Sequence, residues 1–198
     1  MDRPFATFLL FGVSIVILSD CASSPPSRFY SLSAMPAGGA VAAIAAVRPA
    51  APVRVVAVHI PPMLDRQEIA RPSAGDQLVI NGEERWAAPF DEMVQETLTR
   101  DLLERLPAGE VILPAAPAPA QVDSIIVNIL EFQSDVAGSV VFQGSWSLLT
   151  PGAANPALIH DFRYGGNASP QSTSEEVQAM STLLGQLADD IVRSLPAR

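Results

Sequence analysis

Cys21 is the only cysteine of the chain, and its surroundings point to chemistry on its thiol. It follows an apolar run from Phe5 to Leu18, with Arg3 ahead of the run as a minimal positive charge. A run of this length is typical of a signal-peptide core, because a membrane-spanning helix needs about 20 apolar residues. We predict that residues 1–20 are removed and that Cys21 carries lipid, with a diacylglycerol on its thiol and a third acyl chain, such as palmitate, on its new amino group. Each buried methylene contributes roughly 0.8 kcal/mol, so such chains anchor a domain firmly.

Asp20 departs from the small residue that usually precedes a lipidated cysteine, and it bears on how efficiently the signal is cleaved. Two alternatives to lipidation therefore stay open. One is ordinary secretion, with cleavage after the small pair Ala22-Ser23. The other is an N-terminal anchor that is never cleaved.

Other side chains that commonly do chemistry are few: the sequence has two histidines, His59 and His160, and no lysine. A zinc site would need both histidines and nearby carboxylates, which show no ligand spacing, so we predict no metal and no cofactor. His160 and Asp161 could join a serine in a hydrolase triad, but neighbouring strand residues point to opposite faces and no Gly-x-Ser-x-Gly motif is present. The absence of lysine excludes Schiff-base chemistry. A non-catalytic protein is therefore the favoured interpretation.

Composition limits the partners and the domain count. The formal net charge of −9 argues against nucleic acid as a partner. With no second cysteine available for a disulfide, the core must come from packing alone. We predict a tether at residues 21–27 and a single domain at residues 28–198, with a flexible Ala/Pro/Gly-rich segment at residues 34–52.

Alternating and β-branched runs predict the strands that would hold these side chains. They lie at residues 28–32, 53–60, 67–71, 77–81, 124–133, 139–149 and 157–164. The third and fourth runs should form a hairpin, with the fourth ending at Asn81-Gly82. The last three should form a meander. In its middle strand, the apolar residues Val140, Phe142, Trp146 and Leu148 share one face, which is typical of a sheet that is wet on one side.

Two amphipathic helices complete the predicted domain. The first begins near Pro89 and runs to about Leu106, with apolar residues every four positions and the pairs Glu96–Arg100 and Asp101–Arg105 on its outer face. The second follows a capping box at Ser172-x-x-Glu175 and carries the apolar stripe Val177, Met180, Leu184, Leu187, Ile191 and Leu195. The predicted fold class is therefore α+β, a two-layer sandwich in which two helices pack on one face of a mostly antiparallel, mixed sheet.

Two short motifs precede the first helix: Leu64-Asp65-Arg66, and Arg85-Trp86 before Pro89. With Phe29-Tyr30-Ser31-Leu32 ahead of them, they give nearly all of residues 28–195 a resemblance to a known family. The chain resembles the ABC-type transport auxiliary lipoproteins, the DUF330 or paraquat-inducible protein C type.

The resemblance implies a non-catalytic lipoprotein of a Gram-negative envelope. Its implied partners are an MCE-domain protein, a permease and an ATPase that move phospholipids or other hydrophobic molecules between the two membranes. Ala22 after Cys21, in place of an aspartate, favours sorting to the outer membrane, where the protein would face the periplasm and dock the MCE protein. A homo-oligomer fits the same role.

Leu64, Asp65, Arg66, Arg85 and Trp86 admit two interpretations. They form either a structural turn and cover for the helix start, or a contact for a protein partner, since Trp and Arg are enriched in binding hot spots. A lipid groove between sheet and helices stays open beside a packed core. Two other functions also stay open: a pilot lipoprotein for secretion or envelope assembly, and a periplasmic hydrolase.

Overall fold

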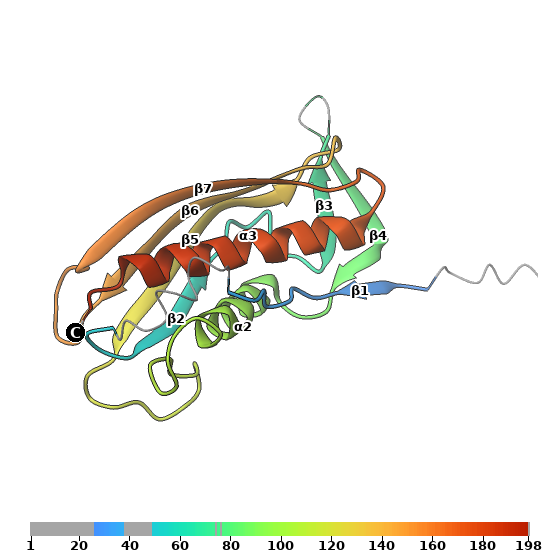
Figure 1. Cartoon of the computed structure of the whole chain (residues 1–198). Helices are drawn as coiled ribbons and strands as arrows, with labels where there is room; N and C mark the ends of the chain where they lie inside the picture. Colours follow the sequence, from blue (N-terminus) through green and yellow to red (C-terminus); the bar gives the residue numbers. More distant parts are fainter. Residues whose placement is uncertain (1–25, 38–48, 74, 76, 198) are drawn as a thin grey trace, which may run out of the picture.

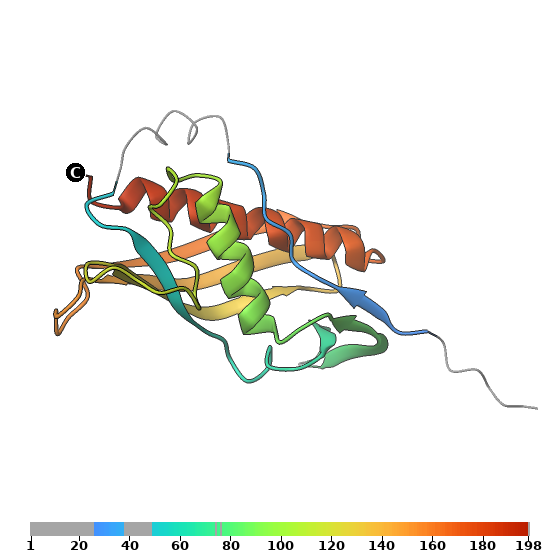
Figure 2. The ribbon, with the colours of Figure 1, turned by 90° about the horizontal axis from the view of Figure 1, so that it is seen from below.

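The protein, analysed as a computed structural model, is described over residues 26–37, 49–73, 75 and 77–197. Its elements in chain order are β1 (Arg28–Tyr30), β2 (Val53–His59), β3 (Glu68–Pro72), β4 (Leu78–Trp86), α2 (Phe90–Leu103), β5 (Asp123–Ser134), β6 (Ser139–Leu149), β7 (Leu158–Asn167) and α3 (Thr173–Ser194). Both helices cover one side of the large sheet (Figures 1 and 2). The predicted α+β fold class is confirmed. The strands, however, are divided between a four-stranded sheet and a three-stranded one.

The four-stranded sheet, in the order β2-β5-β6-β7, carries the core. Strands β5, β6 and β7 pair antiparallel as the predicted meander, and β2 adds to the edge in parallel with β5. The predicted apolar face of β6 is confirmed, because its four members are fully buried beneath the helices. Alternation along β6 thus determines which side of the sheet the helices cover.

Helix α3 begins where the capping motif predicts. The hydroxyl of Ser172 accepts a hydrogen bond from the backbone N–H of Glu175 at 3.2 Å. The carboxylate of Glu175 accepts from the backbone N–H of Ser169, so the reciprocal half of the box is displaced by three residues. The predicted apolar stripe faces the sheet and α2, with all members buried except the half-buried Leu195.

Helix α2 differs from its prediction on one side. The pair Asp101–Arg105, predicted on the outer face, is buried: Asp101 is 0% exposed and Arg105 is 2% exposed. Helix α3 and the chain around Met35 cover this side of α2, and the guanidinium of Arg105 hydrogen-bonds to both. Spacing alone marks the two charges as a pair but does not show that other elements cover them.

The small sheet, in the order β1-β4-β3, also departs from prediction. Strand β4 continues past Asn81-Gly82, where it was expected to end, and reaches Trp86. The turn-forming pair instead lies in an irregular stretch, because Glu68 of β3 pairs with Arg85 while Ala70 pairs with Ile80. Parallel pairing of β1 with residues 84–86 extends the sheet beyond this bulge.

The segment after β1 is held against the helices at Met35. Its backbone N–H donates to the carboxylate of Asp101 at 2.7 Å, and its carbonyl accepts from Arg105 at 2.9 Å. The start of the predicted flexible stretch at residues 34–52 is therefore fixed by contacts that composition does not reveal. Residues 38–48 of that stretch lie outside the described residues.

The predicted signal at residues 1–20 and Cys21 also lie outside the described residues, so lipidation stays a prediction. Over the part of the chain that the structure describes, no helix has the length and hydropathy needed to cross a membrane.

Candidate functional site

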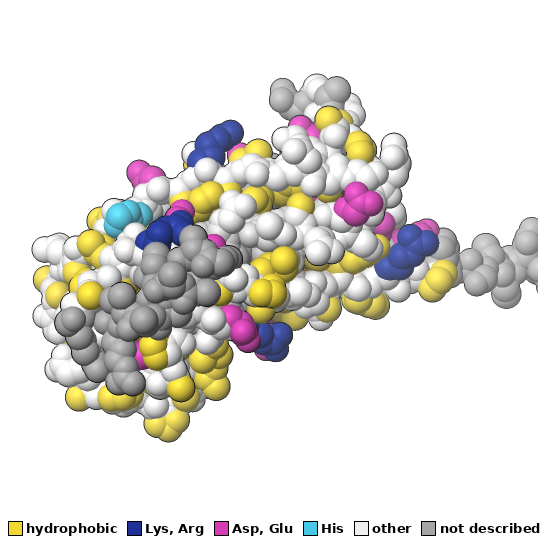
Figure 3. All heavy atoms as spheres, in the orientation of Figure 1, with side chains coloured by type: hydrophobic (Ala, Val, Ile, Leu, Met, Phe, Trp, Pro, Cys, Tyr) yellow, Lys and Arg dark blue, Asp and Glu magenta, His cyan; other side chains and the backbone are white. Residues whose placement is uncertain are grey.

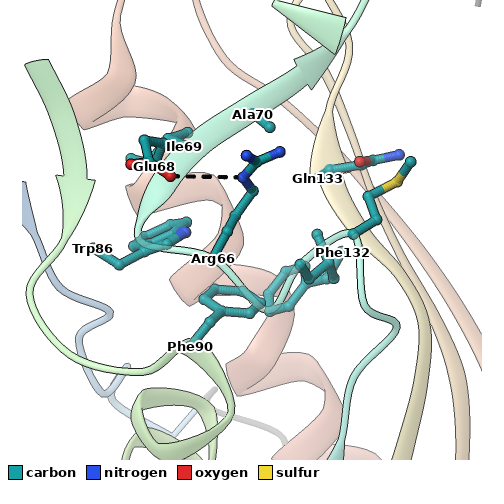
Figure 4. A pocket seen from close by; sticks show the side chains of 10 residues that line it. Arg66, Glu68, Ile69, Ala70, Trp86, Phe90, Phe132 and Gln133 are labelled. Atoms are coloured by element: carbon teal, nitrogen blue, oxygen red, sulfur yellow. Dashed lines mark ion pairs between the residues drawn. The ribbon is translucent and has the colours of Figure 1, made fainter. Parts of the chain in front are cut away.

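The loop between β2 and β3 brings three of the five predicted site residues together. Leu64, Arg66 and Trp86 line a small pocket where the small sheet meets the N-terminus of α2 and strand β5 (Figure 4). Phe90 and Phe132 form other parts of its wall. The loop is shaped by its own backbone, in which Leu64 N–H donates to the carbonyl of Pro61 and Arg66 N–H to the carbonyl of Leu64.

Asp65 and Arg85 do not line the pocket. Asp65 is exposed on the loop. Arg85 neighbours Trp86 in β4 and so points to the opposite face, where its Nε donates to the carbonyl of Gly82 at 3.1 Å. The five residues therefore occupy one region without forming one cluster.

Trp86 has a packing role in this arrangement. It is buried, and its ring lies 4.8 Å from that of Phe90, which in turn lies 5.7 Å from Phe132. The row continues to Phe142 in β6, stacked 3.9 Å from Phe132. Aromatic pairs at these separations contribute roughly 0.5–1.5 kcal/mol each beyond their buried area. The row joins the small sheet to the core of the large one.

The pocket has a volume of about 20 Å³. That is room for about one water molecule, which needs roughly 10–15 Å³ measured in the same way. An acyl chain does not fit there. The apolar faces of both helices are also occupied, because they form the core.

The accessible part of the site is polar with one apolar side chain. Arg66 is partly exposed, and Figure 4 shows it beside Glu68, with Nε and Oε2 3.7 Å apart. Exposed Met63 and Asp65 precede it in the loop. Opposite charges beside an apolar methionine are typical of the rim of a protein–protein interface.

Arg71 is a residue that the sequence interpretation missed. From β3 it donates through Nε to Glu176 at 2.7 Å and through Nη2 to Thr173 at 2.8 Å, both in the first turn of α3. Glu84 of β4 lies 3.4 Å from its Nη1. These mostly buried charges tie the β3–β4 hairpin to α3. No sequence spacing links β3 with a helix a hundred residues later.

The two histidines lie on strands at opposite edges of the large sheet, His59 on β2 and His160 on β7. Three strand spacings, about 14 Å, separate the two edges, so the pair does not share a metal ion. His160 stacks on Trp146 with ring centroids 5.0 Å apart. Its register partner is Trp146, whereas that of Asp161 is Ser145, so His160 and Asp161 point to opposite faces as predicted.

Comparison with known proteins gives a consistent result. The family model for the ABC-type transport auxiliary lipoprotein component matches residues 30–192. The intermembrane transport lipoprotein PqiC of Escherichia coli (strain K12) is 24% identical over 138 residues, which cover 70% of this chain and 71% of PqiC.

Two solved structures share the fold. One is an uncharacterized protein with a TM-score of 0.67 and 21% identity, covering 85% of this chain and 97% of its own. The other is a DUF330 protein of Xanthomonas campestris with a TM-score of 0.63 and 18% identity, covering 83% and 92%.

Proposed function

This chain belongs to the ABC-type transport auxiliary lipoprotein component family, and from that premise we propose that it is a non-catalytic accessory subunit of an MCE-containing ABC system that transports phospholipids or other hydrophobic compounds. The observation that carries the proposal is the family match over residues 30–192, which spans nearly the whole described fold. The relative PqiC is itself named an intermembrane transport lipoprotein. The accessory subunit would support envelope integrity through that transport.

The proposed partner is the MCE-domain protein, together with its permease and ATPase. The pocket beside the predicted site residues has room for one water, and the apolar faces of both helices form the core, so at these two places a role in protein contact is favoured over a role in carrying lipid. The proposed contact surface is the loop Met63 to Glu68, which we name the docking loop. Its accessible charges and apolar methionine are what a polar interface rim requires.

The proposed location is the periplasmic side of the outer membrane, with lipid on Cys21 as the anchor. The apolar run before Cys21 supports the lipid, and Ala22 after it supports outer-membrane sorting. A homo-oligomer is part of this proposal, because several copies would let the subunit surround a larger partner.

Site-specific photocross-linking in the native envelope tests the docking loop. A photoreactive residue replaces exposed Asp65, and a matched control replaces exposed Asn155 in the loop between β6 and β7. We expect position 65 to cross-link an MCE-domain protein and position 155 to give no such product. Cross-links from position 65 solely to a secretion or assembly complex would contradict the proposal and favour the pilot-lipoprotein alternative.

A further inference from the structure

The far end of the β3–β4 hairpin exposes three consecutive apolar residues. Leu78, Val79 and Ile80 are 39%, 48% and 43% exposed. Successive strand residues point to opposite faces, so Leu78 and Ile80 share one face of the hairpin, and Val79 shares the other with its register partner Arg71, which binds α3. Elsewhere among the described residues, the large exposed apolar side chains are isolated in sequence. We name residues 78–80 the hairpin tip. Figure 1 shows the β3–β4 hairpin rising beyond the body of the fold, and Figure 3 shows a few hydrophobic side chains among the white atoms of this projection.

Strand β1 relates this tip to the N-terminal tether. It runs parallel to the last part of β4, with Arg28 paired to Glu84. The tether therefore begins at the base of the hairpin that carries the tip, on the same small sheet. The strands β1, β3 and β4 all lie at the end of the molecule opposite the C-terminus (Figure 1).

The tether is long enough to place its cysteine level with the tip. Cys21 precedes Arg28 by seven residues, which span at most about 25 Å when extended. Ile80 precedes Glu84 by four residues that include the irregular stretch of β4, so the two lie at most about 14 Å apart. A membrane that holds lipid on Cys21 is thus within reach of the hairpin tip.

We infer that the hairpin tip, residues Leu78 to Ile80, is a second membrane contact, which rests in the interface of the bilayer that holds the lipid on Cys21. The inference rests on the lipid anchor of the proposed function. Between Pro72 and Gly82 the only charged residue in the sequence is Asp76, so the contact is at headgroup depth and not at the hydrocarbon centre. Two points of attachment orient the domain, whereas a tether alone leaves it free to rotate.

A depth measurement on the full lipidated chain tests the inference. Val79→Cys receives an environment-sensitive fluorophore, and the protein is reconstituted into phosphatidylethanolamine and phosphatidylglycerol vesicles that contain lipid spin-labelled near the headgroup. Ile159→Cys, on the exposed edge strand β7, is the matched control. Lipid on Cys21 leaves the introduced thiol as the only one that reacts, so wild-type protein serves as the labelling blank.

We expect the spin label to quench the probe at position 79 at least about threefold more than at position 159, since interfacial contacts bury apolar groups only ~5–10 Å deep. Equal quenching at both positions would overturn the inference. A second result would also overturn it: fluorophore emission at position 79 that changes with the amount of protein per vesicle but is not quenched, because a second copy of the protein would then cover the tip.

The vesicles contain no transporter, so the identity of the protein partner does not influence the outcome. If the wild-type protein reacts with the fluorophore, its Cys21 is free and carries no lipid. That result would overturn the inference, because the inference rests on this lipid. Failure to capture an MCE-domain protein, with strong quenching at position 79, would contradict the proposed partner and leave the membrane contact standing.

Discussion

Replacing Arg105 with methionine removes the guanidinium that joins α2, α3 and the segment around Met35. The side chain donates to the carbonyls of Met35 and Asp101, each at 2.9 Å, and of Gly185 at 3.2 Å, and it also binds the carboxylate of Asp189. Its Nη1 lies 3.3 Å from the carboxylate of fully buried Asp101. Removing one partner of a buried ion pair costs about 3–5 kcal/mol, because the other charge stays buried without compensation. We expect Arg105→Met to lose that amount of unfolding free energy.

The assay is urea unfolding of the purified, unlipidated chain, followed by far-ultraviolet circular dichroism. Arg100→Met is the matched control in α2, which ends at Leu103, shortly before Arg105, because the side chain of Arg100 is 58% exposed and pairs with exposed Glu96. Exposed pairs of this kind contribute about 0.3–0.5 kcal/mol. Adding Asp101→Asn to Arg105→Met should restore part of the loss, since the uncompensated charge is removed. Equal stability of the Arg105 and Arg100 variants would refute the buried network.

Three further predictions follow from buried groups and close backbone contacts. Burial raises the pKa of Asp101 from 3.8 to about 6 despite the opposing effects of the Met35 N–H and Arg105, and Asp189 adds to the rise. The folded state therefore binds this proton more tightly than the unfolded state does. This binding contributes about 3 kcal/mol to the free energy of unfolding below pH 4, and the contribution is lost as the pH rises through 6. Denaturation between pH 4 and 7 should show this decline in wild type and its loss in Asp101→Asn; parallel pH profiles would contradict it. Gly144→Ala places a Cβ against the backbone oxygen of Asn128 and should cost about 1–3 kcal/mol in urea unfolding, whereas Gly82→Ala, with open space around it, should be near neutral; equal effects would show that β5 and β6 are not so closely paired. Ser172→Ala removes the α3 cap and should cost about 1 kcal/mol, with thermal unfolding unchanged if the cap does not form.

Local patterns in the sequence predicted most of the fold. The alternation of β6, the apolar spacing of both helices and the Ser172 cap each depend on residues near one another in the chain, and each is confirmed. The errors arose where contacts between segments that are distant in the sequence determine the structure. Asn81-Gly82 is typical of a turn, but the chain continues as a strand there because it pairs with β1 and β3. The spacing of Asp101 and Arg105 is that of an exposed ion pair, but α3 covers the pair in the folded protein.

The candidate site could be predicted as a region but not as an arrangement. In its structural interpretation Trp86 was expected to cover the helix start, and its ring lies 4.8 Å from that of Phe90, the first residue of α2. Arg66 lines the pocket, whereas Arg85 faces away from it. The orientation of Arg85 follows from the alternation of side chains along β4, and this strand was expected to end before residue 85. Arg71 was missed because its partners lie in β4 and in α3.

The central claim is that this chain is an accessory subunit of an MCE-containing lipid transporter. Its most direct test is affinity purification of the C-terminally tagged protein from its native envelope, with cross-linking and mass spectrometry of the proteins recovered. The account predicts an MCE-domain protein among the specific partners, with cross-links at the docking loop. Recovery of a secretion or assembly complex without any MCE-domain protein would contradict it.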